Sequence, residues 1–270
     1  MAVLSTDADP VIDGIPFRDP ARPILKRDPR RAWKHFKLLV QDKEETSHVF
    51  EIFKSLPRKD FLEYARNFCL SEEGKELYRR ERALAPILDD HDALRALGPG
   101  TVAAEYIHFM ESQGLTAAGL NAEYEAFAKD YGKYDDMLEW FYSRSRETHD
   151  LLHVLTGYSR DALGEQCVLA FTYGQDRMPA HLLIAYAGIF EIRRVVRSSA
   201  PVFRAVREAQ RHGTRCPNIA HMPIRELLAK PLEQARQELR IGEPTFYNRC
   251  HEIWRGIGRD PYSVLRPATA

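Results

Sequence analysis

Apolar side chains recur every three to four residues along most of this chain, a period that is typical of amphipathic helices. The first such stretch contains Trp33, Phe36 and Val40. Strand signals are almost absent, since we find no alternating run that ends in an Asn-Gly or Asp-Gly turn. The pattern therefore predicts an all-α fold. After the first helix, helices are expected over His48–Leu56, Lys59–Leu70, Glu72–Leu84, Asp89–Leu97, Thr101–Gln113, Thr116–Tyr131, Tyr134–Thr156, Ala162–Tyr173, Ala180–Ser199, Val202–His212, Arg225–Arg240 and Thr245–Ile257.

The same pattern divides the chain into three parts. Residues 1–30 contain five prolines and little periodicity, so we expect a flexible or surface-draped N-terminal arm. Residues 31–260 hold the predicted helices and are expected to form a single multi-helix domain with a large core. Residues 261–270 are expected to be a C-terminal tail.

The stretch Leu182–Phe190 is the most apolar of the chain. It is too short to span a bilayer, which needs roughly 18–20 apolar residues. A helix that is apolar on all sides normally lies at the centre of a core, and the alternative is that it lines an apolar channel or touches a membrane. The arginines that follow it, Arg193, Arg194 and Arg197, fit either a membrane or phosphate contact or simple compensation of the helix dipole.

Composition narrows the class of protein. The chain has 39 basic and 39 acidic residues, and this balance argues against a general nucleic-acid-binding protein. Its four cysteines form no CxxC pair and are read as reduced thiols. The N-terminus carries three acids and no base before Arg18, so it resembles neither a secretory signal nor a mitochondrial targeting peptide. We therefore expect a protein of the bacterial cytoplasm.

One short stretch carries the candidate chemistry. His149 and His153 are four residues apart, about 40° from each other around a helix, and Asp150 lies at the edge of that face. Gly157 offers a helix end, so that a tight helical hairpin can bring Glu165 back toward both histidines. These four side chains are candidate ligands of one metal ion. The alternative is a pair of hydrogen-bonded histidines beside acidic helix caps, and the residues alone leave both interpretations open.

Neighbouring residues support the site less strongly. Tyr142 and Ser145 share the histidine face and are candidates for contacting the ligands or a substrate, while simple packing explains them equally well. Arg160 and Lys230 are possible contacts for a carboxylate or a phosphate, although nothing in their surroundings singles them out. The remaining histidines considered have no partner at metal-ligand spacing: His108, His181, His212, His221 and His251.

The segment HDLLHVLTGYSRDALGE, residues 149–165, resembles the HDxxH-x11-E signature of the fourth ubiquinone (coenzyme Q) biosynthesis protein family, Coq-four. The residues on either side of the motif also resemble the family. Arg146 stands three residues before the motif, as an arginine does in the family, and Arg177-Met178-Pro179 resembles the Gly-Leu-Pro sequence that precedes its next helix. The resemblance covers about residues 85–245 and is most specific at the motif. The first 85 residues and the last 25 match poorly.

The resemblance implies an all-helical homodimer at the periphery of the inner membrane. It implies a metal held by His149, Asp150, His153 and Glu165 beside an apolar tunnel for a polyprenylated aromatic or quinone intermediate. The family is associated with oxidative decarboxylation and hydroxylation at ring carbon one, with His149 and Asp150 assigned here to catalysis and Asp150 as fourth ligand or proton acceptor. The alternative is a non-catalytic scaffold that binds the intermediate and organises other ubiquinone-biosynthesis proteins.

The ligand set leaves the metal open. Zinc fits histidines and carboxylates and is the expected ion, but zinc has no redox chemistry of its own. If only His149, His153 and one carboxylate bind, the set resembles the facial triad that suits ferrous iron. A metal phosphohydrolase of the His-Asp class is a third possibility. It would need another upstream histidine, for which His108 is the only candidate and lacks the expected context.

Overall fold

A computed structural model describes residues 10–42, 45–129 and 132–264 of the chain. Helices account for most of these residues, which confirms the all-α prediction. Three predicted segments extend beyond the described residues: positions 1–9 of the N-terminal arm, 130–131 at the end of the helix predicted over Thr116–Tyr131, and 265–270 of the tail.

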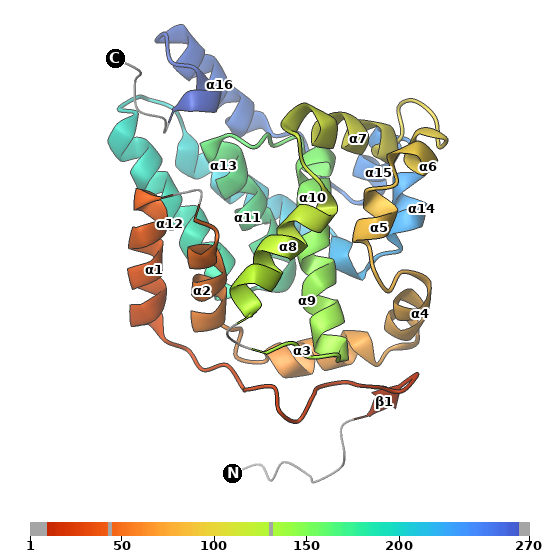
Figure 1. The fold of residues 1–270 in the computed structure, drawn as a ribbon. Coiled ribbons are helices and arrows are strands. Elements are labelled where there is room, and N and C mark those ends of the chain that lie inside the picture. The colour runs from red at the N-terminus through yellow and green to blue at the C-terminus, as the bar shows by residue number, and fades with distance from the viewer. Residues whose placement is uncertain (1–9, 43–44, 130–131, 265–270) are drawn as a thin grey trace.

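The elements follow one another with short connections (Figure 1). The two strands are β1 (Val11–Ile12) and β2 (Ile15–Pro16). The first eight helices are α1 (Pro29–Gln41), α2 (Ser47–Ser55), α3 (Phe61–Cys69), α4 (Glu72–Arg80), α5 (Ala85–Leu88), α6 (His91–Arg95), α7 (Val102–Gln113) and α8 (Ala117–Ala128). They are followed by α9 (Met137–Glu147), α10 (His149–Thr156), α11 (Ala162–Asp176), α12 (Pro179–Val195), α13 (Val202–Arg215), α14 (Ile224–Leu228), α15 (Leu232–Glu238) and α16 (Thr245–Gly256).

Helix α11 lies at the centre of the largest core and packs on both α12 and α13. The backbones of α11 and α13 approach closely because each helix has a glycine at the crossing. A Cβ atom on Gly213 would lie 1.9 Å from the Phe171 carbonyl oxygen, and one on Gly174 would lie 2.5 Å from the Gln210 carbonyl oxygen. This tight pairing fixes α11, the helix that carries Glu165 at its start.

The single helix predicted over Tyr134–Thr156 is in fact two helices, α9 and α10, which meet at Thr148. The Thr148 hydroxyl donates hydrogen bonds to the carbonyls of Arg144, at 3.0 Å, and Ser145, at 3.3 Å. Threonine hydroxyls that bond back to the preceding turn in this way bend helices. The predicted helix over Arg225–Arg240 is likewise divided into α14 and α15, because Pro231 cannot continue a helix.

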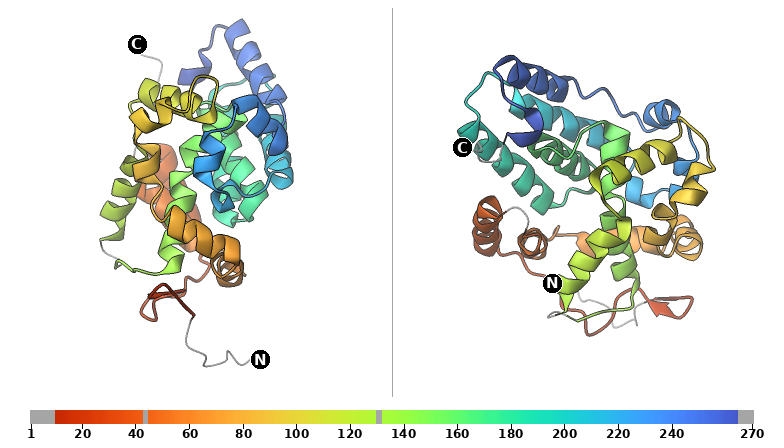
Figure 2. Two further views of the ribbon diagram at one scale, coloured as in Figure 1. Left: turned by 90° about the vertical axis from the view of Figure 1, so that its right-hand side faces the viewer. Right: turned by 45° about the horizontal axis from the view of Figure 1, so that its top comes forward.

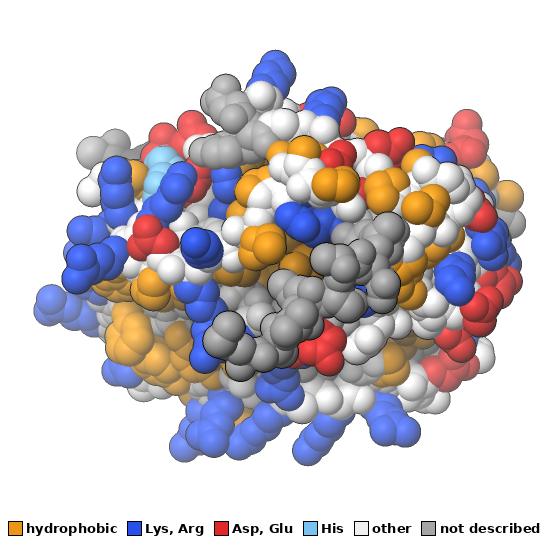
Figure 3. Space-filling view, turned by 90° about the horizontal axis from the view of Figure 1, so that it is seen from below, with side chains coloured by type: hydrophobic (Ala, Val, Ile, Leu, Met, Phe, Trp, Pro, Cys, Tyr) orange, Lys and Arg blue, Asp and Glu red, His pale blue; other side chains and the backbone are white. Residues whose placement is uncertain are grey.

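The N-terminal arm contains a hairpin that the sequence analysis missed. Asp13 and Gly14 join β1 to β2, both with positive φ, at 50° and 85°. Such a pair forms the tight turn that best matches the twist of two antiparallel strands. Strands of two residues are too short to show alternation, so the pattern could not reveal them. The hairpin lies on the lower face of the molecule, where Figure 3 shows Lys and Arg side chains around hydrophobic ones.

The rest of the arm, residues 17–28, packs on the helical domain. Phe17 is buried and Arg22 pairs with Asp136 at 2.8 Å and with Glu139 at 3.0 Å. Asp136 is itself the N-cap residue of α9, so these contacts tie the arm to the start of that helix. Residues 10–28 are thus held to the helical domain by a buried aromatic side chain and by ion pairs.

The apolar stretch Leu182–Phe190 forms part of α12, and its two sides differ. Ala185 and Ile189 are fully buried, whereas Phe190 is 65% exposed. The buried side of α12 packs mainly against α11, and α12 also contacts α1 and α2, which lie at one edge of the molecule with α2 next to α8 (Figures 1 and 2). Among the described helices, none combines the length and the apolar character needed to cross a bilayer.

His221 lies against the aromatic rings of Tyr64, Phe68 and Phe141 and should make stability depend on pH. Its ring stacks on Phe68 with 3.8 Å between ring centroids. Burial, assisted by the charge of Arg144, lowers the pKa of His221 to about 4. The pKa of a histidine in the unfolded chain is about 6.5, so as the pH falls the unfolded state binds the proton first. The stability that is present above about pH 6.5 is therefore lost as the pH falls toward 4.

We expect the free energy of unfolding to fall less in His221→Phe than in the wild type between pH 7 and pH 4. The difference should reach at most about 3 kcal/mol, measured by urea denaturation at both pH values. Equal losses in the two proteins would show that His221 is not the titrating group.

Candidate metal centre and its cavity

The hairpin of α10 and α11 positions the histidines and Glu165. Helix α10 ends at Gly157, whose φ of +74° is the left-handed conformation that glycine adopts most readily. Four residues later Asp161 begins α11 by accepting hydrogen bonds from the backbone N–H groups of Leu163 and Gly164. The chain therefore reverses within a few residues, as the sequence predicts, and Glu165 in the first turn of α11 faces α10.

Three side chains converge at this hairpin. The Nε2 atoms of His149 and His153 each lie 3.5 Å from Oε2 of Glu165. Nitrogen and oxygen atoms of the three residues lie within 4.8 Å of one another, the only such group of histidine, cysteine and acidic residues among those described. His149 and Glu165 are about one third exposed, whereas the His153 side chain is fully buried.

His153 has the orientation expected of a metal ligand. Its Nδ1 lies 2.8 Å from the Tyr158 carbonyl oxygen, so Nδ1–H donates there and Nε2 is the ring nitrogen that faces Glu165. Nε2 is buried and has no hydrogen-bond partner among the described residues. A buried polar atom without a partner is costly, and a cation in front of it would satisfy it. The residues thus fit a metal ion, and the fit rests on this atom.

The charges in the cluster favour ionised Glu165. Burial by itself would raise its pKa, but the two imidazoles outweigh burial and lower the pKa of Glu165 well below its usual range. Burial also opposes a charge on His149, while the hydrogen bond and the charge of Glu165 raise the pKa of His149 above its ordinary value. A carboxylate is therefore available as a ligand, and a bound cation would take the place of the proton on His149.

Asp150, the fourth expected ligand, lies outside this group of three. It follows His149 directly, so it points about 100° away around α10. Its charge acts on Tyr106 of α7, whose buried hydroxyl has no hydrogen-bond partner in the described part of the chain. Asp150 nevertheless lines the same cavity as His149, so it remains close to any ligand bound there.

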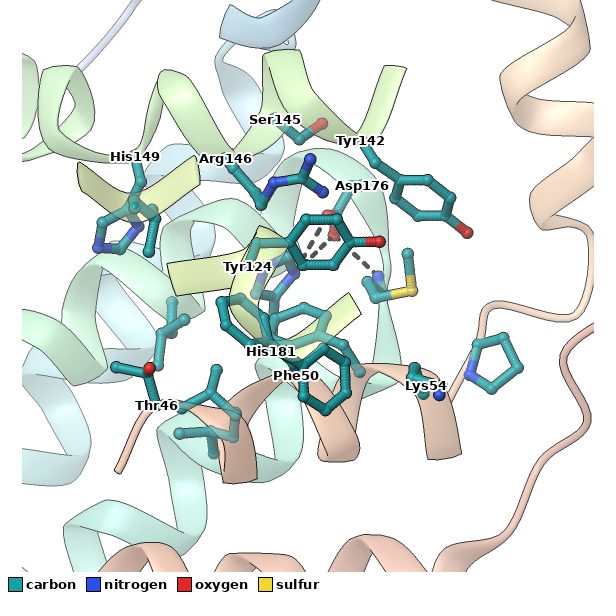
Figure 4. A pocket seen from close by; sticks show the side chains of 18 of the residues that line it. Thr46, Phe50, Lys54, Tyr124, Tyr142, Ser145, Arg146, His149, Asp176 and His181 are labelled. Atoms are coloured by element: carbon teal, nitrogen blue, oxygen red, sulfur yellow. Dashed lines mark hydrogen bonds and ion pairs between the residues drawn. The ribbon is translucent and has the colours of Figure 1, made fainter. Parts of the chain in front are cut away.

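A cavity of about 1450 Å³ opens beside the cluster. Side chains from α1, α2, α3, α8, α9, α11 and α12 line it, and His149 and Arg146 point into it (Figure 4). Glu165 and Asp176 both line it from opposite ends of α11, which places them about 16 Å apart along that helix. Its apolar walls include Phe36, Leu39, Val40, Val49, Phe50, Phe53, Leu120, Phe127, Leu169, Met178 and Ile184.

Tyr142 and Ser145 also line this cavity. The ring of Tyr142 stacks on Phe61 of α3 with 4.9 Å between centroids, and the Ser145 hydroxyl donates to the Phe141 carbonyl. Their place in the cavity wall would bring both residues near a bound ligand. The stacking on Phe61 and the hydrogen bond to Phe141, however, are contacts of ordinary packing within the protein. Their proposed roles in the site therefore stay predictions.

Sequence reasoning missed a polar network behind the hairpin. The Tyr247 hydroxyl of α16 donates to Asp161 Oδ2, and His251 Nε2 lies 3.3 Å from Asp161 Oδ1. Arg160, which had no distinguishing sequence signal, places Nε 3.6 Å from Glu165 Oε1. Tyr247 and His251 lie about 90 residues after Asp161, and no local pattern in the sequence links such distant positions.

Gly164 should be required for the position of Glu165. A Cβ atom at this residue would lie 1.8 Å from the Ser159 carbonyl oxygen, which forces the start of α11 away from the turn. We expect Gly164→Ala to weaken metal binding at least tenfold, as loss of a supporting contact typically does. Titration calorimetry with Zn²⁺ would measure it. Gly256→Ala, where no heavy atom lies within 4 Å of the new Cβ, is the control and should bind normally.

Comparison with known proteins identifies the family to which this helical chain belongs. The sequence profile of the family described as "Coenzyme Q (ubiquinone) biosynthesis protein Coq4" matches residues 60–245, and the chain belongs to that family. The resemblance inferred from the motif is thereby confirmed. The match begins just before α3, so α1 and α2 lie outside it.

Two relatives illustrate the similarity. The mitochondrial ubiquinone biosynthesis protein COQ4 homolog of Bos taurus is 28% identical over 173 residues, which are 64% of this chain and 62% of the bovine protein. The chain thus spans less than two thirds of that relative. The Rattus norvegicus protein of the same description is 24% identical over 213 residues, 78% of this chain and 73% of the rat protein.

A solved structure supports the fold. The crystal structure of a Nostoc punctiforme protein, described as a ubiquinone biosynthesis protein, superposes on this chain with a TM-score of 0.52 and 18% sequence identity. The superposition covers 81% of this chain and all of the other. At this identity the likeness concerns the fold alone.

Proposed function

We propose that this protein acts in ubiquinone biosynthesis as a metal-dependent oxidative decarboxylase of a polyprenylated hydroxybenzoate-type precursor. It would replace the carboxylate on ring carbon one with a hydroxyl group. Membership in the Coq4 family supports the pathway. The observation that carries the site is the buried, unpartnered Nε2 of His153, which faces Glu165 and His149 beside a large apolar cavity.

In this proposal His149, His153 and Glu165 hold a divalent metal. The bound ion would supply positive charge that binds the substrate carboxylate or phenolate. The Tyr158 carbonyl keeps His153 in the tautomer that binds a metal, and Asp161 fixes the first turn of the helix that carries Glu165. Two imidazoles and one carboxylate match the facial triad of ferrous iron as well as a zinc site, so both metals are candidates.

The cavity fits the remaining parts of such a substrate. Its aromatic and aliphatic walls can exclude water from a prenyl chain, and its length along α11, about 16 Å, accommodates a ring and the beginning of the chain. We propose that Asp150, which lines the cavity beside His149, accepts the proton released from the ring hydroxyl.

With dioxygen as the oxidant the reaction balances. The aromatic acid, O₂ and water give the phenol, CO₂ and H₂O₂: the bond from the ring to the carboxyl carbon breaks, and a bond from the ring to oxygen forms. The ring carbon loses two electrons and dioxygen gains them. No further electron donor is required.

Turnover under air separates this proposal from the scaffold alternative. Purified protein loaded with Fe²⁺ or Zn²⁺ is mixed with a geranyl-substituted 4-hydroxybenzoate labelled at the carboxyl carbon. The proposal expects more than one equivalent of labelled CO₂ per protein and formation of the phenol. Binding of one equivalent without release of CO₂, with either metal, would instead support a scaffold that only holds the intermediate.

We further propose peripheral contact with the bacterial inner membrane. Six exposed basic residues support it, and they surround Trp33, which is 50% exposed on α1. The group consists of Lys26, Arg27, Arg30, Arg31, Lys34 and Lys37. A homodimer and contacts with other ubiquinone-biosynthesis proteins are proposed from the family alone, and sedimentation equilibrium would measure the dimer.

A further inference from the structure

Arg146, one of several cationic residues that line the cavity, points into it one helical turn before His149 (Figure 4). Its guanidinium carbon lies 3.7 Å from the centroid of the Tyr124 ring, so the planar group stacks on the aromatic face. One Nη atom donates to Glu139 at 3.0 Å, and Nε donates to the side-chain oxygen of Asn121, Oδ1, at 3.5 Å. Three neighbours on α8 and α9 therefore fix the guanidinium before any ligand arrives.

These contacts leave part of the guanidinium unused. The hydrogen bonds to Asn121 and Glu139 use Nε and one Nη atom, and the side chain is 16% exposed. Arginine cannot lose its charge in a protein, and Glu139, the carboxylate partner of Arg146, is shared with Arg22, so the inward-facing guanidinium can still attract an anionic ligand. Carboxylates suit it best, because the fork of N–H groups matches their two oxygens.

We propose that Arg146 recognises the carboxylate of an aromatic acid bound in this cavity and makes the site select carboxylated over uncharged rings. This inference rests on the substrate class proposed above. Each of Arg146 and Arg160 already contacts one carboxylate, Glu139 and Glu165, and Arg146 is preferred because its side chain is 16% exposed whereas that of Arg160 is 40% exposed. A ligand ring placed beside Tyr124, with its prenyl chain along the walls formed by α2 and α12, brings its carboxylate between Arg146 and the His149 cluster.

Binding without turnover tests the assignment. The probes are a geranyl-substituted 4-hydroxybenzoate and its methyl ester, which has the same ring and chain but no charge on the carboxyl group. We expect wild-type protein to bind the acid more than tenfold more tightly than the ester at pH 7.5, a difference of at least about 1.4 kcal/mol. In Arg146→Gln this preference for the acid should fall by at least about fivefold, leaving only what the metal contributes, with the dissociation constant of the ester unchanged.

Matched variants separate recognition from folding. Arg146→Lys keeps the charge but loses the stacked fork, and should retain a reduced preference for the acid. Arg211→Gln makes the same change on the exposed outer side of α13 and should behave as wild type. Bound metal and melting temperature are measured for each.

Two outcomes would overturn the assignment, and they differ in meaning. If Arg146→Gln keeps the preference, or loses affinity for acid and ester equally, Arg146 does not recognise the carboxylate, while the proposed function stands. If wild-type protein binds neither probe, the proposed substrate class itself fails and the role of Arg146 fails with it.

Discussion

Replacing His153 with alanine should reduce bound divalent metal from about one equivalent to less than a tenth. The His153 side chain is fully buried, its Nε2 faces Glu165, and no other described histidine or acid joins the group to replace it. Losing one of three ligands removes the closed geometry on which affinity depends. Metal analysis of protein purified without chelator or nickel resin measures the effect, and CO₂ release in the turnover assay should fall to background.

His181→Ala is the matched control for this prediction. His181 lines the same cavity and pairs with Asp176 at 3.1 Å, but it does not belong to the group of three. It should retain its metal. Full metal occupancy in His153→Ala, with the fold intact by circular dichroism, would rule out the proposed centre.

Replacing Arg144 with alanine should cause the largest loss of stability. Arg144 is 1% exposed and pairs with Glu81, itself 3% exposed, at 2.8 Å. Arg144 Nε also donates to the Ala220 carbonyl at 2.6 Å, and Glu81 accepts from the backbone N–H groups of Ile224 and Arg225. Removing the cation leaves a buried carboxylate without its counter-charge, which typically costs about 3–5 kcal/mol.

For a chain of this size that loss corresponds to a melting temperature lower by about 10 °C. Differential scanning calorimetry and urea denaturation would measure it. The control is Arg249→Ala, which breaks the exposed pair of Arg249 and Glu252 and should cost less than about 1 kcal/mol. Losses of similar size in the two variants would mean that the buried pair contributes no more than a surface pair.

Much of the fold followed from the sequence because helices depend on local periodicity. The pattern predicted α7, α11, α13 and α16 to within a few residues at each end. The prediction of helix bounds failed where a single residue interrupts a helix although the apolar period continues through it. Thr148 breaks a predicted helix through its side-chain hydrogen bonds, and Pro231 breaks another because it lacks an N–H group. The hairpin at Asp13 was missed because two-residue strands show no period.

The candidate site divides in the same way. That His149, His153 and Glu165 can meet follows from local sequence. The interval of four residues places both histidines on one face of α10, and the helix end at Gly157 lets the chain turn back toward them. The packing of α11 beside α10 then brings Glu165 to 3.5 Å from both histidines, whereas Asp150 lies outside the group. The cavity, the orientation of Arg146 over Tyr124 and the clamp of α16 on Asp161 were also decided only by the tertiary structure. Each requires contact between segments far apart in the chain, and packing alone brings such segments together.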